Sequence, residues 1–278
     1  MTTENTTDPR VDCTVTADGL ITFGLRLPAA APGTRLLLRL RPKKGQPERT
    51  LHFLPLEAAG ETDDGRHTAV LPVGTVLAEG RWDVYLTDGP DTARRRPRPG
   101  PRDLRALVDG AARDRTAPVA VRVPYATKDG YLAVRAWLRD AHAETGRVTV
   151  ADGTLTVAAR LHGASLTDDA AVLLRPRGTG TERLLPLRAA ADRRDFTFTA
   201  DLAELAAPAG DTGTATRIWD VFVRPDGTSA RVRVARLLDD VADRKDVHVL
   251  PAATVAGTVL RPYYTVDNDL AVTAAPAG

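Results

Sequence analysis

Hydrophobic and polar residues alternate one by one in many short stretches of this chain. The pattern is present in Ile21–Leu27, Leu36–Arg41, Leu155–Leu161, Phe196–Thr199 and Arg231–Val234. Successive side chains of a β-strand point to opposite faces, so a period of two predicts strands with one buried face. Turn sequences rich in Asp and Gly separate these stretches, and about seven to nine short strands are expected in each half of the chain.

Three segments depart from the strand pattern. Asp201–Ala207 has the composition of a short helix, with Asp201 as its N-cap. Its counterpart in the first half, Thr75–Glu79, is expected to form a corner between sheets. Arg94–Arg102 contains five Arg and three Pro in nine residues, a composition that predicts an extended surface loop.

The sequence also contains an internal repeat, in which five matches occur in the same order with shifts of 131 to 138 positions. The matched segments are Ala17–Leu27 with Ala151–Leu161, Leu38–Arg41 with Leu174–Arg177, Leu54–Leu56 with Leu185–Leu187, Trp82–Leu86 with Trp219–Val223, and Pro124–Val134 with Pro262–Val272. Such self-similarity indicates two copies of one domain.

Together, the strand pattern and the repeat predict an all-β protein. We expect two tandem immunoglobulin-like antiparallel β-sandwich domains, at residues 11–143 and 144–278, after a disordered N-terminal tail at residues 1–10. Trp82 and Trp219 lie in equivalent strands, in phase with hydrophobic neighbours. They are therefore expected to be core residues.

Composition excludes several classes of function. The chain has 38 Lys and Arg against 36 Asp and Glu, a net charge of only +2, which argues against a nucleic-acid partner. Its one cysteine, Cys13, excludes an internal disulfide or a multi-cysteine zinc site and is expected to be a small buried residue. No signal peptide and no apolar run of membrane-spanning length is present. A soluble cytoplasmic protein without membrane insertion is expected.

No group of residues has the spacing of a catalytic site, and we expect no catalytic residue, no metal and no cofactor. The five histidines are scattered without the spacing of metal ligands. Asp267–Asp269 resembles the Asp-x-Asp sequence that binds a metal and a nucleotide sugar. It aligns with Lys128–Gly130, a turn before the last strand of the first copy. A hairpin turn is therefore the favoured interpretation, and a metal site is the alternative.

The candidate ligand-binding residues are arginines on outward strand positions and two tyrosines. They are Arg26, Arg39, Arg41, Arg160, Arg175, Arg177, Tyr263 and Tyr264. A planar guanidinium group suits a phosphate or a carboxylate, although a solvated face with salt bridges is the alternative for the arginines. An exposed tyrosine can stack on a sugar, whereas packing at the end of a strand is the alternative for the tyrosines.

Two motifs carry a resemblance to a known family. Trp219–Phe222 and Pro262–Thr265, with partial copies at Trp82–Tyr85 and Pro124-Tyr125, resemble the C-terminal tandem domains of actinobacterial family 2 glycosyltransferases. These enzymes are similar to the poly(ribitol-phosphate) N-acetylglucosaminyltransferases that decorate wall teichoic acid. The resemblance implies β-sandwiches that serve oligomerisation and hold the polymer. Because the first repeat begins about ten residues after Met1, we expect no nucleotide-sugar domain and no enzymatic activity.

Three hypotheses about function follow. The first is a non-catalytic accessory module for glycosylation of a cell-surface glycopolymer, whose partner is the polymer or a separately encoded glycosyltransferase, with a homo-oligomer as a further candidate. The second is a tandem β-sandwich scaffold that binds proteins. The third is an enzyme with an unrecognised site between the domains.

Overall fold

The computed structural model describes residues 8–27, 31–42, 45–48, 50–60, 65–89, 92–178, 181–206 and 216–277. Within these residues, 53% of the protein is strand and 4% is helix, so the predicted all-β class is confirmed. Residues 1–7 of the predicted disordered tail lie outside the described residues, and the first strand begins at Arg10.

The chain forms two compact units. Unit 1 consists of Met1–Arg113, Ala120–Leu138 and Leu238–Ala242, and unit 2 consists of Asp114–Val119, Arg139–Leu237 and Asp243–Gly278. Each unit therefore takes a short segment from the other half of the sequence.

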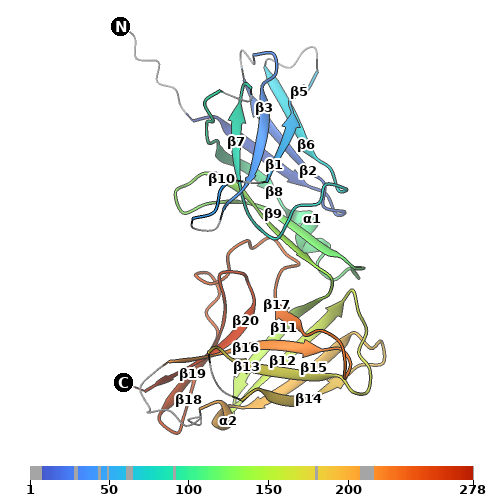
Figure 1. The fold of residues 1–278 in the computed structure, drawn as a ribbon, viewed down its shortest axis with the longest axis vertical. Helices are drawn as coiled ribbons and strands as arrows, with labels where there is room; N and C mark the ends of the chain where they lie inside the picture. The colour runs from blue at the N-terminus through green and yellow to red at the C-terminus, as the bar shows by residue number, and fades with distance from the viewer. Residues whose placement is uncertain are drawn as a thin grey trace. The chain divides into compact units, whose positions relative to one another are not determined.

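Unit 1 contains two five-stranded sheets, with strand orders β5-β6-β2-β1-β8 and β4-β3-β7-β10-β9 (Figure 1). The strands are β1 (Arg10–Val15), β2 (Ile21–Arg26), β3 (Arg35–Leu40), β4 (Leu51–Pro55), β5 (Glu57–Ala58), β6 (Arg66–Leu71), β7 (Gly80–Thr87), β8 (Arg98–Asp103), β9 (Val119–Ala126) and β10 (Leu132–Arg139). Helix α1 (Arg105–Asp109) follows β8. Every second residue of β2, namely Ile21, Phe23 and Leu25, is buried, as the alternating pattern predicts.

Unit 2 contains corresponding strands in the same order, with its helix at a different place and with a different closure of the sheet. Its strands are β11 (His142–Ala151), β12 (Thr154–His162), β13 (Ala171–Pro176), β14 (Arg183–Ala189), β15 (Asp195–Asp201), β16 (Arg217–Arg224), β17 (Val232–Ala235), β18 (Ala253–Val255), β19 (Thr258–Tyr264) and β20 (Leu270–Pro276), with helix α2 (Leu202–Ala206). The order β13-β14-β15-β12-β11-β17-β16 closes into a ring of seven strands because β16 also pairs with β13. The two sheets of the predicted sandwich are thus joined at both edges in this unit.

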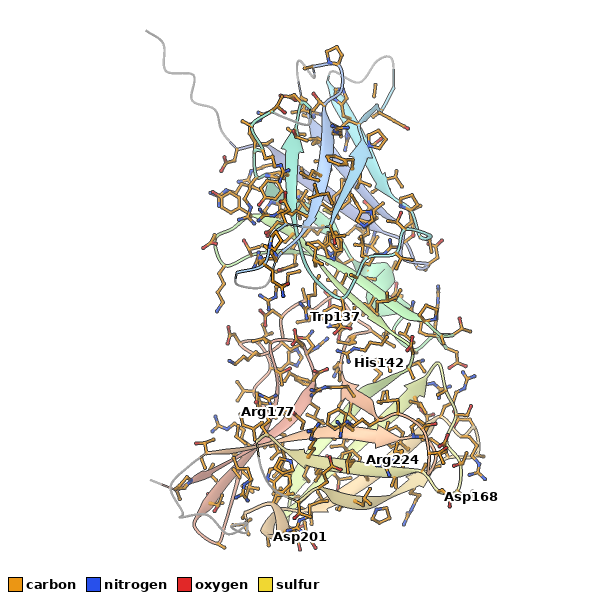
Figure 2. All side chains as sticks on the ribbon, viewed as in Figure 1. Trp137, His142, Asp168, Arg177, Asp201 and Arg224 are labelled. Atoms are coloured by element: carbon orange, nitrogen blue, oxygen red, sulfur yellow. The ribbon has the colours of Figure 1, made fainter. Side chains whose placement is uncertain are left out.

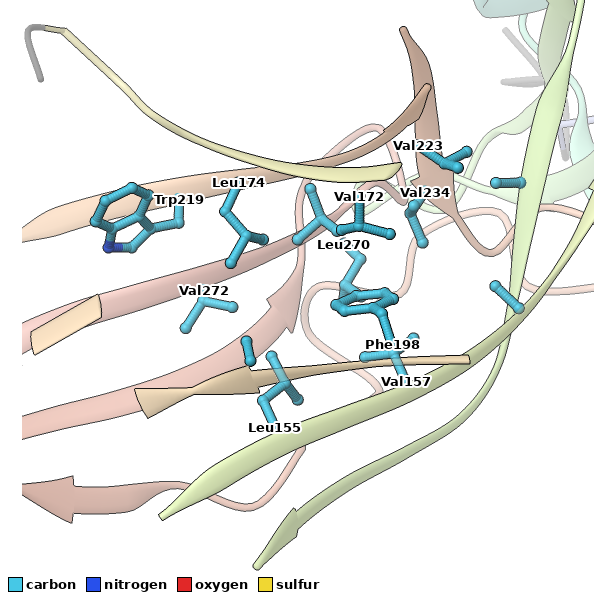
Figure 3. Close-up of a cluster of buried hydrophobic side chains, with 14 of the residues drawn as sticks. Leu155, Val157, Val172, Leu174, Phe198, Trp219, Val223, Val234, Leu270 and Val272 are labelled. Carbon is cyan, nitrogen blue, oxygen red and sulfur yellow. The ribbon is translucent and has the colours of Figure 1, made fainter. Parts of the chain in front are cut away.

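The core of unit 2 is a single cluster of aliphatic and aromatic side chains (Figure 3). Phe198 and Trp219 lie in it with Leu155, Leu174 and Val272, all at most 2% exposed. The prediction that Trp82 and Trp219 are core residues is confirmed, since their exposed fractions are 0% and 2%. Large buried aromatic rings of this kind contribute several kcal/mol each to stability.

The two units share strand pairings as well as strand order. β1 and β8 pair in parallel in unit 1, as β11 and β17 do in unit 2. The antiparallel partners β3 and β7 correspond to β13 and β16, and β7 and β10 correspond to β16 and β20. The internal repeat of the sequence is therefore a repeat of topology.

The predicted loop at Arg94–Arg102 is wrong for its second half, where Arg98–Asp103 forms strand β8 beside β1. β8 lies at the edge of its sheet, a place where Pro is tolerated because one side of the strand needs no N–H donor. Gly100 packs against Asp12 so closely that a Cβ atom would collide with the Asp12 carboxylate. The Pro-rich composition predicted a loop here and gave no indication of this strand.

Corner segments before the two tryptophan strands are equivalent. Trp82 donates its Nε1–H to Ala78 O at 3.0 Å, and Trp219 donates to Leu205 O at 3.3 Å. The predicted N-cap of α2 is confirmed, since Asp201 Oδ1 accepts the Ala203 N–H at 2.8 Å. The last residue of the predicted helix, residue 207, lies outside the described residues, and α1 was not predicted.

Cys13 is 1% exposed, as expected of a small buried residue, and burial raises its pKa to about 12. Within the described ranges, no helix combines the length and the apolar character that crossing a membrane requires.

Candidate functional site

An aspartate occupies the same place on the outer surface of both units. Trp82 points into the core of unit 1, so strand alternation turns the next residue, Asp83, to the opposite face. Arg39 of β3 lies directly across from Asp83 in the strand register. Unit 2 repeats this arrangement, with Arg175 of β13 opposite Asp220 of β16. Each unit thus places an arginine beside a carboxylate on an outer sheet surface.

Three arginines surround the Asp83 carboxylate. Arg41 donates from Nη2 to Oδ1 at 2.6 Å and from Nε to Oδ2 at 3.3 Å, so this contact is bidentate. Arg39 Nη2 lies 3.1 Å from Oδ2, and Arg96 Nη2 lies 3.1 Å from Oδ1. Burial would raise the pKa of Asp83, but the hydrogen bonds and charges of these arginines lower it overall. Asp83 is therefore ionised at neutral pH.

A second carboxylate, that of Glu48, extends the group. Arg94 Nη1 lies 2.9 Å from Glu48 Oε1, and Arg39 Nη1 lies 3.5 Å from the same oxygen. We call these residues the arginine cluster of unit 1, with the members Arg39, Arg41, Arg94, Arg96, Glu48 and Asp83. Four arginines against two carboxylates give the cluster a formal charge of +2.

The arginine cluster of unit 2 has corresponding members, Arg175, Arg177, Arg231, Arg233, Glu182 and Asp220, which lie 134 to 137 positions after their counterparts. Arg177, labelled in Figure 2, has Nη2 2.8 Å from Asp220 Oδ1, and Arg233 Nη1 lies 3.4 Å from the same oxygen. Arg175 Nε and Arg231 Nη1 lie 3.6 Å and 3.2 Å from Glu182 Oε1. The charge balance of unit 1 is therefore duplicated.

Each cluster also contains one aromatic ring, two residues after its aspartate. Arg39 Cζ lies 5.0 Å from the centroid of the Tyr85 ring in unit 1. Arg233 Cζ and Arg231 Cζ lie 4.7 Å and 5.1 Å from the centroid of the Phe222 ring in unit 2. Such cation–π contacts fix the orientation of the guanidinium groups.

The arginines of both clusters remain partly exposed. Their side-chain exposed fractions are 25–41% in unit 1 and 36–48% in unit 2. A guanidinium group carries five N–H donors in a fork that matches the oxygens of phosphate or carboxylate. Held in place by ion pairs and ring contacts, these groups can bind anionic groups of an external molecule.

The structure brings together only some of the residues singled out in the sequence. Arg39, Arg41, Arg175 and Arg177 belong to the clusters. Tyr263 on β19 is half-buried and close enough to Arg177 for its charge to affect the pKa of Arg177.

The other three predicted residues lie elsewhere. Arg26 is exposed at the end of β2, in the other sheet of unit 1. Arg160 on β12 pairs with three carboxylates, those of Asp114, Asp192 and Asp195. Tyr264 is 2% exposed, so its ring packs in the core and is not available for stacking on a ligand.

Sequence reasoning missed half of the arginines and both carboxylates of each cluster. Arg94 and Arg96 were assigned to a loop without a counterpart, although Arg231 and Arg233 lie 137 positions later. Extending the repeat with a fixed shift through this segment is the signal that would have found them.

Asp267–Asp269 forms the turn between β19 and β20, as the favoured interpretation predicted. Asn268 has a φ of 62°, and the Thr265 N–H donates to Asp269 O at 2.8 Å. The Asp269 side chain faces two arginines, with Arg139 Nη2 at 3.0 Å and Arg233 Nε at 3.5 Å. Burial raises the pKa of Asp269, although both arginines favour its ionised form.

Comparisons with known proteins give limited similarity. No family model and no curated protein sequence matches the chain. Among solved structures, the chain gives a match to S. aureus TarS residues 217–571, with 15% identity over 69% of this chain and 55% of that chain and a TM-score of 0.31. A second crystal structure of S. aureus TarS has 15% identity over 69% of this chain and 35% of that chain, with a TM-score of 0.29. The chain thus spans about half or less of the proteins it resembles.

Proposed function

We propose that the chain is a non-catalytic module that binds a phosphate-bearing cell-surface glycopolymer through its two arginine clusters. The observation that carries the proposal is the duplication of four partly exposed arginines, two carboxylates and one ring at equivalent positions. Asp83 and Asp220 are buried, and compensating each of these carboxylates needs one arginine. The further ion pairs of each cluster are partly exposed and contribute only about 0–1 kcal/mol each to stability. Fold stability alone is therefore a weak reason for keeping such a cluster in both units.

A polymer with regularly repeated phosphates suits a protein with repeated cationic sites. Two sites on one chain raise the overall affinity for such a ligand because the second contact becomes intramolecular. The resemblance of Trp219–Phe222 and Pro262–Thr265 to tandem domains of teichoic-acid glycosyltransferases supports a polyol phosphate as the ligand. We propose further that immunoglobulin-like units hold the polymer while a separately encoded glycosyltransferase transfers the sugar.

Titration of the purified chain with a short synthetic ribitol-phosphate oligomer tests this proposal by isothermal calorimetry. We expect measurable binding that weakens with added NaCl, because salt screens the attraction between exposed charges, with a Debye length of about 8–10 Å at near-physiological ionic strength. Arg41→Gln and Arg177→Gln each remove one bidentate donor next to an aspartate. Each substitution is expected to weaken binding about tenfold, the equivalent of one charge-assisted hydrogen bond.

Arg26→Gln is the matched control, because Arg26 is an exposed strand arginine outside both clusters. It should bind the oligomer as the unmodified chain does. Absence of binding by the unmodified chain, or equal losses in Arg26→Gln and Arg41→Gln, would contradict the proposal.

A further inference from the structure

Tyrosine rings and guanidinium groups alternate along the outer face of unit 1. Arg39 Cζ lies 5.0 Å from the centroid of the Tyr85 ring. Arg96 Cζ follows, 5.9 Å from Tyr85 and 4.4 Å from the centroid of Tyr131, and Arg98 Cζ lies 4.3 Å from Tyr131. We call these five residues the arginine–tyrosine ladder. Stacking against a ring fixes the plane of a guanidinium group, so little further entropy is lost when its N–H groups bind an anion.

Tyr131 of the ladder occupies the same backbone position as Asp269 of unit 2. Each residue directly precedes the last strand of its unit. The turns before them match as well, since Thr127 N–H donates to Tyr131 O at 2.8 Å and Thr265 N–H donates to Asp269 O at 2.8 Å. At this position the side chain is a phenol in unit 1 and a carboxylate in unit 2.

The Asp269 carboxylate engages the arginines of its own unit. Its Oδ1 accepts a hydrogen bond from Arg139 Nη2 at 3.0 Å, and its Oδ2 lies 3.5 Å from Arg233 Nε. Arg233 also contacts Asp220, at 3.4 Å. The guanidinium group of Arg233 thus lies between two carboxylates of the protein.

Arg96, the counterpart of Arg233, has a different environment. It contacts one carboxylate, that of Asp83, and the faces of two tyrosine rings. Its Nε is buried without an acceptor within the part of the chain that the structure describes. This Nε corresponds to the very atom that faces Asp269 in unit 2. Unit 1 therefore has no carboxylate at the place where Asp269 engages the equivalent guanidinium group in unit 2.

We propose that the arginine–tyrosine ladder of unit 1 is a site for the phosphodiester groups of a polyol-phosphate chain, and that Asp269 fills the equivalent place in unit 2. This inference rests on the proposed function, and it assigns binding of the phosphodiester groups to unit 1. Guanidinium forks match the paired oxygens of a phosphodiester. A carboxylate at the same place repels an incoming anion and neutralises part of the charge of the neighbouring guanidinium group.

Exchanging the two side chains tests this assignment. Tyr131→Asp brings the side chain of unit 2 into unit 1 and should weaken binding of the ribitol-phosphate oligomer at least about tenfold in calorimetry at low salt. Tyr131→Phe keeps the ring and should bind within about twofold of the unmodified chain. Asp269→Asn removes the charge at nearly constant shape and should strengthen binding or raise the number of bound oligomers.

Two further measurements identify the chemical group and guard against misfolding. Inorganic phosphate should compete with the oligomer, and neutral ribitol should not; competition by ribitol alone would overturn the phosphodiester assignment.

If Tyr131→Asp lowers the melting temperature, Arg98→Gln replaces it as the test variant, since this substitution keeps both tyrosine rings and removes one guanidinium group. Arg98→Gln should weaken binding about fivefold, and unchanged binding would overturn the proposal.

The failures of the two proposals are distinguishable. If Arg41→Gln weakens binding while Tyr131→Asp and Arg98→Gln leave it unchanged, the module binds the polymer but the ladder is not its phosphate site. If the unmodified chain does not bind the oligomer at all, both proposals fail.

Discussion

Trp219 lies with its indole ring in the core of unit 2 and donates its Nε1–H to Leu205 O at 3.3 Å. Trp219→Ala removes this ring and the hydrogen bond together. We expect the free energy of unfolding to fall by about 3–5 kcal/mol, the usual cost of truncating a buried aromatic residue. Chemical denaturation followed by circular dichroism measures the change. Val249→Ala, at a position with 83% exposure, is the control and should cost less than about 0.5 kcal/mol; equal effects would contradict the burial of the ring.

His162 is buried at the end of β12, with its ring stacked on that of His142 at a centroid distance of 6.3 Å. Burial lowers the pKa of His162 from 6.5 to about 4, and the charges of His142 and Arg160 add to the effect. The charges of Glu144 and Asp114 act in the opposite direction and raise the pKa of His162. The folded protein therefore resists protonation of this ring at a pH where the unfolded chain accepts the proton.

This difference makes the stability of unit 2 dependent on pH. The folded pKa lies below the unfolded one, so the contribution is complete above pH 6.5 and is lost as the pH falls toward about 4. We expect a loss of about 2 kcal/mol at pH 5. His162→Asn does not titrate and can still accept the Arg115 N–H. Denaturation between pH 7.5 and pH 5 should show a smaller loss for this variant, and parallel losses would contradict the assignment.

At the scale of elements, two connections between strands of unit 2 contain a glycine with positive φ. Gly163, after β12, has a φ of 77°, and an added Cβ atom would lie 2.7 Å from Asp140 O. Gly153, between β11 and β12, has a φ of 71° and nothing within 4 Å of an added Cβ atom. An alanine at Gly153 therefore meets backbone strain alone, whereas an alanine at Gly163 meets backbone strain and a steric collision.

Gly163→Ala is therefore expected to destabilise the protein more than Gly153→Ala. The left-handed conformation costs each alanine about 1–2 kcal/mol, and the collision at Gly163 adds at least about 1 kcal/mol. Thermal melting of the two variants measures the difference. Equal melting temperatures would mean that the chain near Asp140 moves aside without cost.

Local patterns predicted most of the elements, because strands with one buried face alternate along the sequence and helix α2 begins at a capping aspartate. They did not predict β8, whose Pro-rich sequence is tolerated only at the edge of a sheet. They also did not predict the closed ring of unit 2, since the pairings of β14 with β15 and of β16 with β17 join segments whose register depends on the whole fold.

The candidate site was predictable in part. Arg39 and Arg41 were found because they alternate with core leucines on one strand. Arg94 and Arg96 come from a segment without such a pattern, and they reach Glu48 and Asp83 only after β3 and β7 have paired. A site assembled from three separate segments leaves little local signal in a sequence.

At the scale of the whole molecule, one arrangement of strands is present in both units. Both units have a parallel pairing of their first strand, β1 with β8 and β11 with β17, and an arginine cluster on the outer sheet surface. They differ in closure of the sheet and in the residue at the Tyr131 and Asp269 position.

Arginine side-chain NMR tests the central claim, that the arginine clusters bind a phosphate polymer, most directly. In a titration of the full chain with the ribitol-phosphate oligomer, the Nε–H signals of Arg39, Arg41 and Arg96 should shift in proportion to occupancy. Signals of Arg26 and Arg160, which lie outside both clusters, should stay in place. Shifts confined to Arg26 and Arg160, or no shifts at all, would contradict the account.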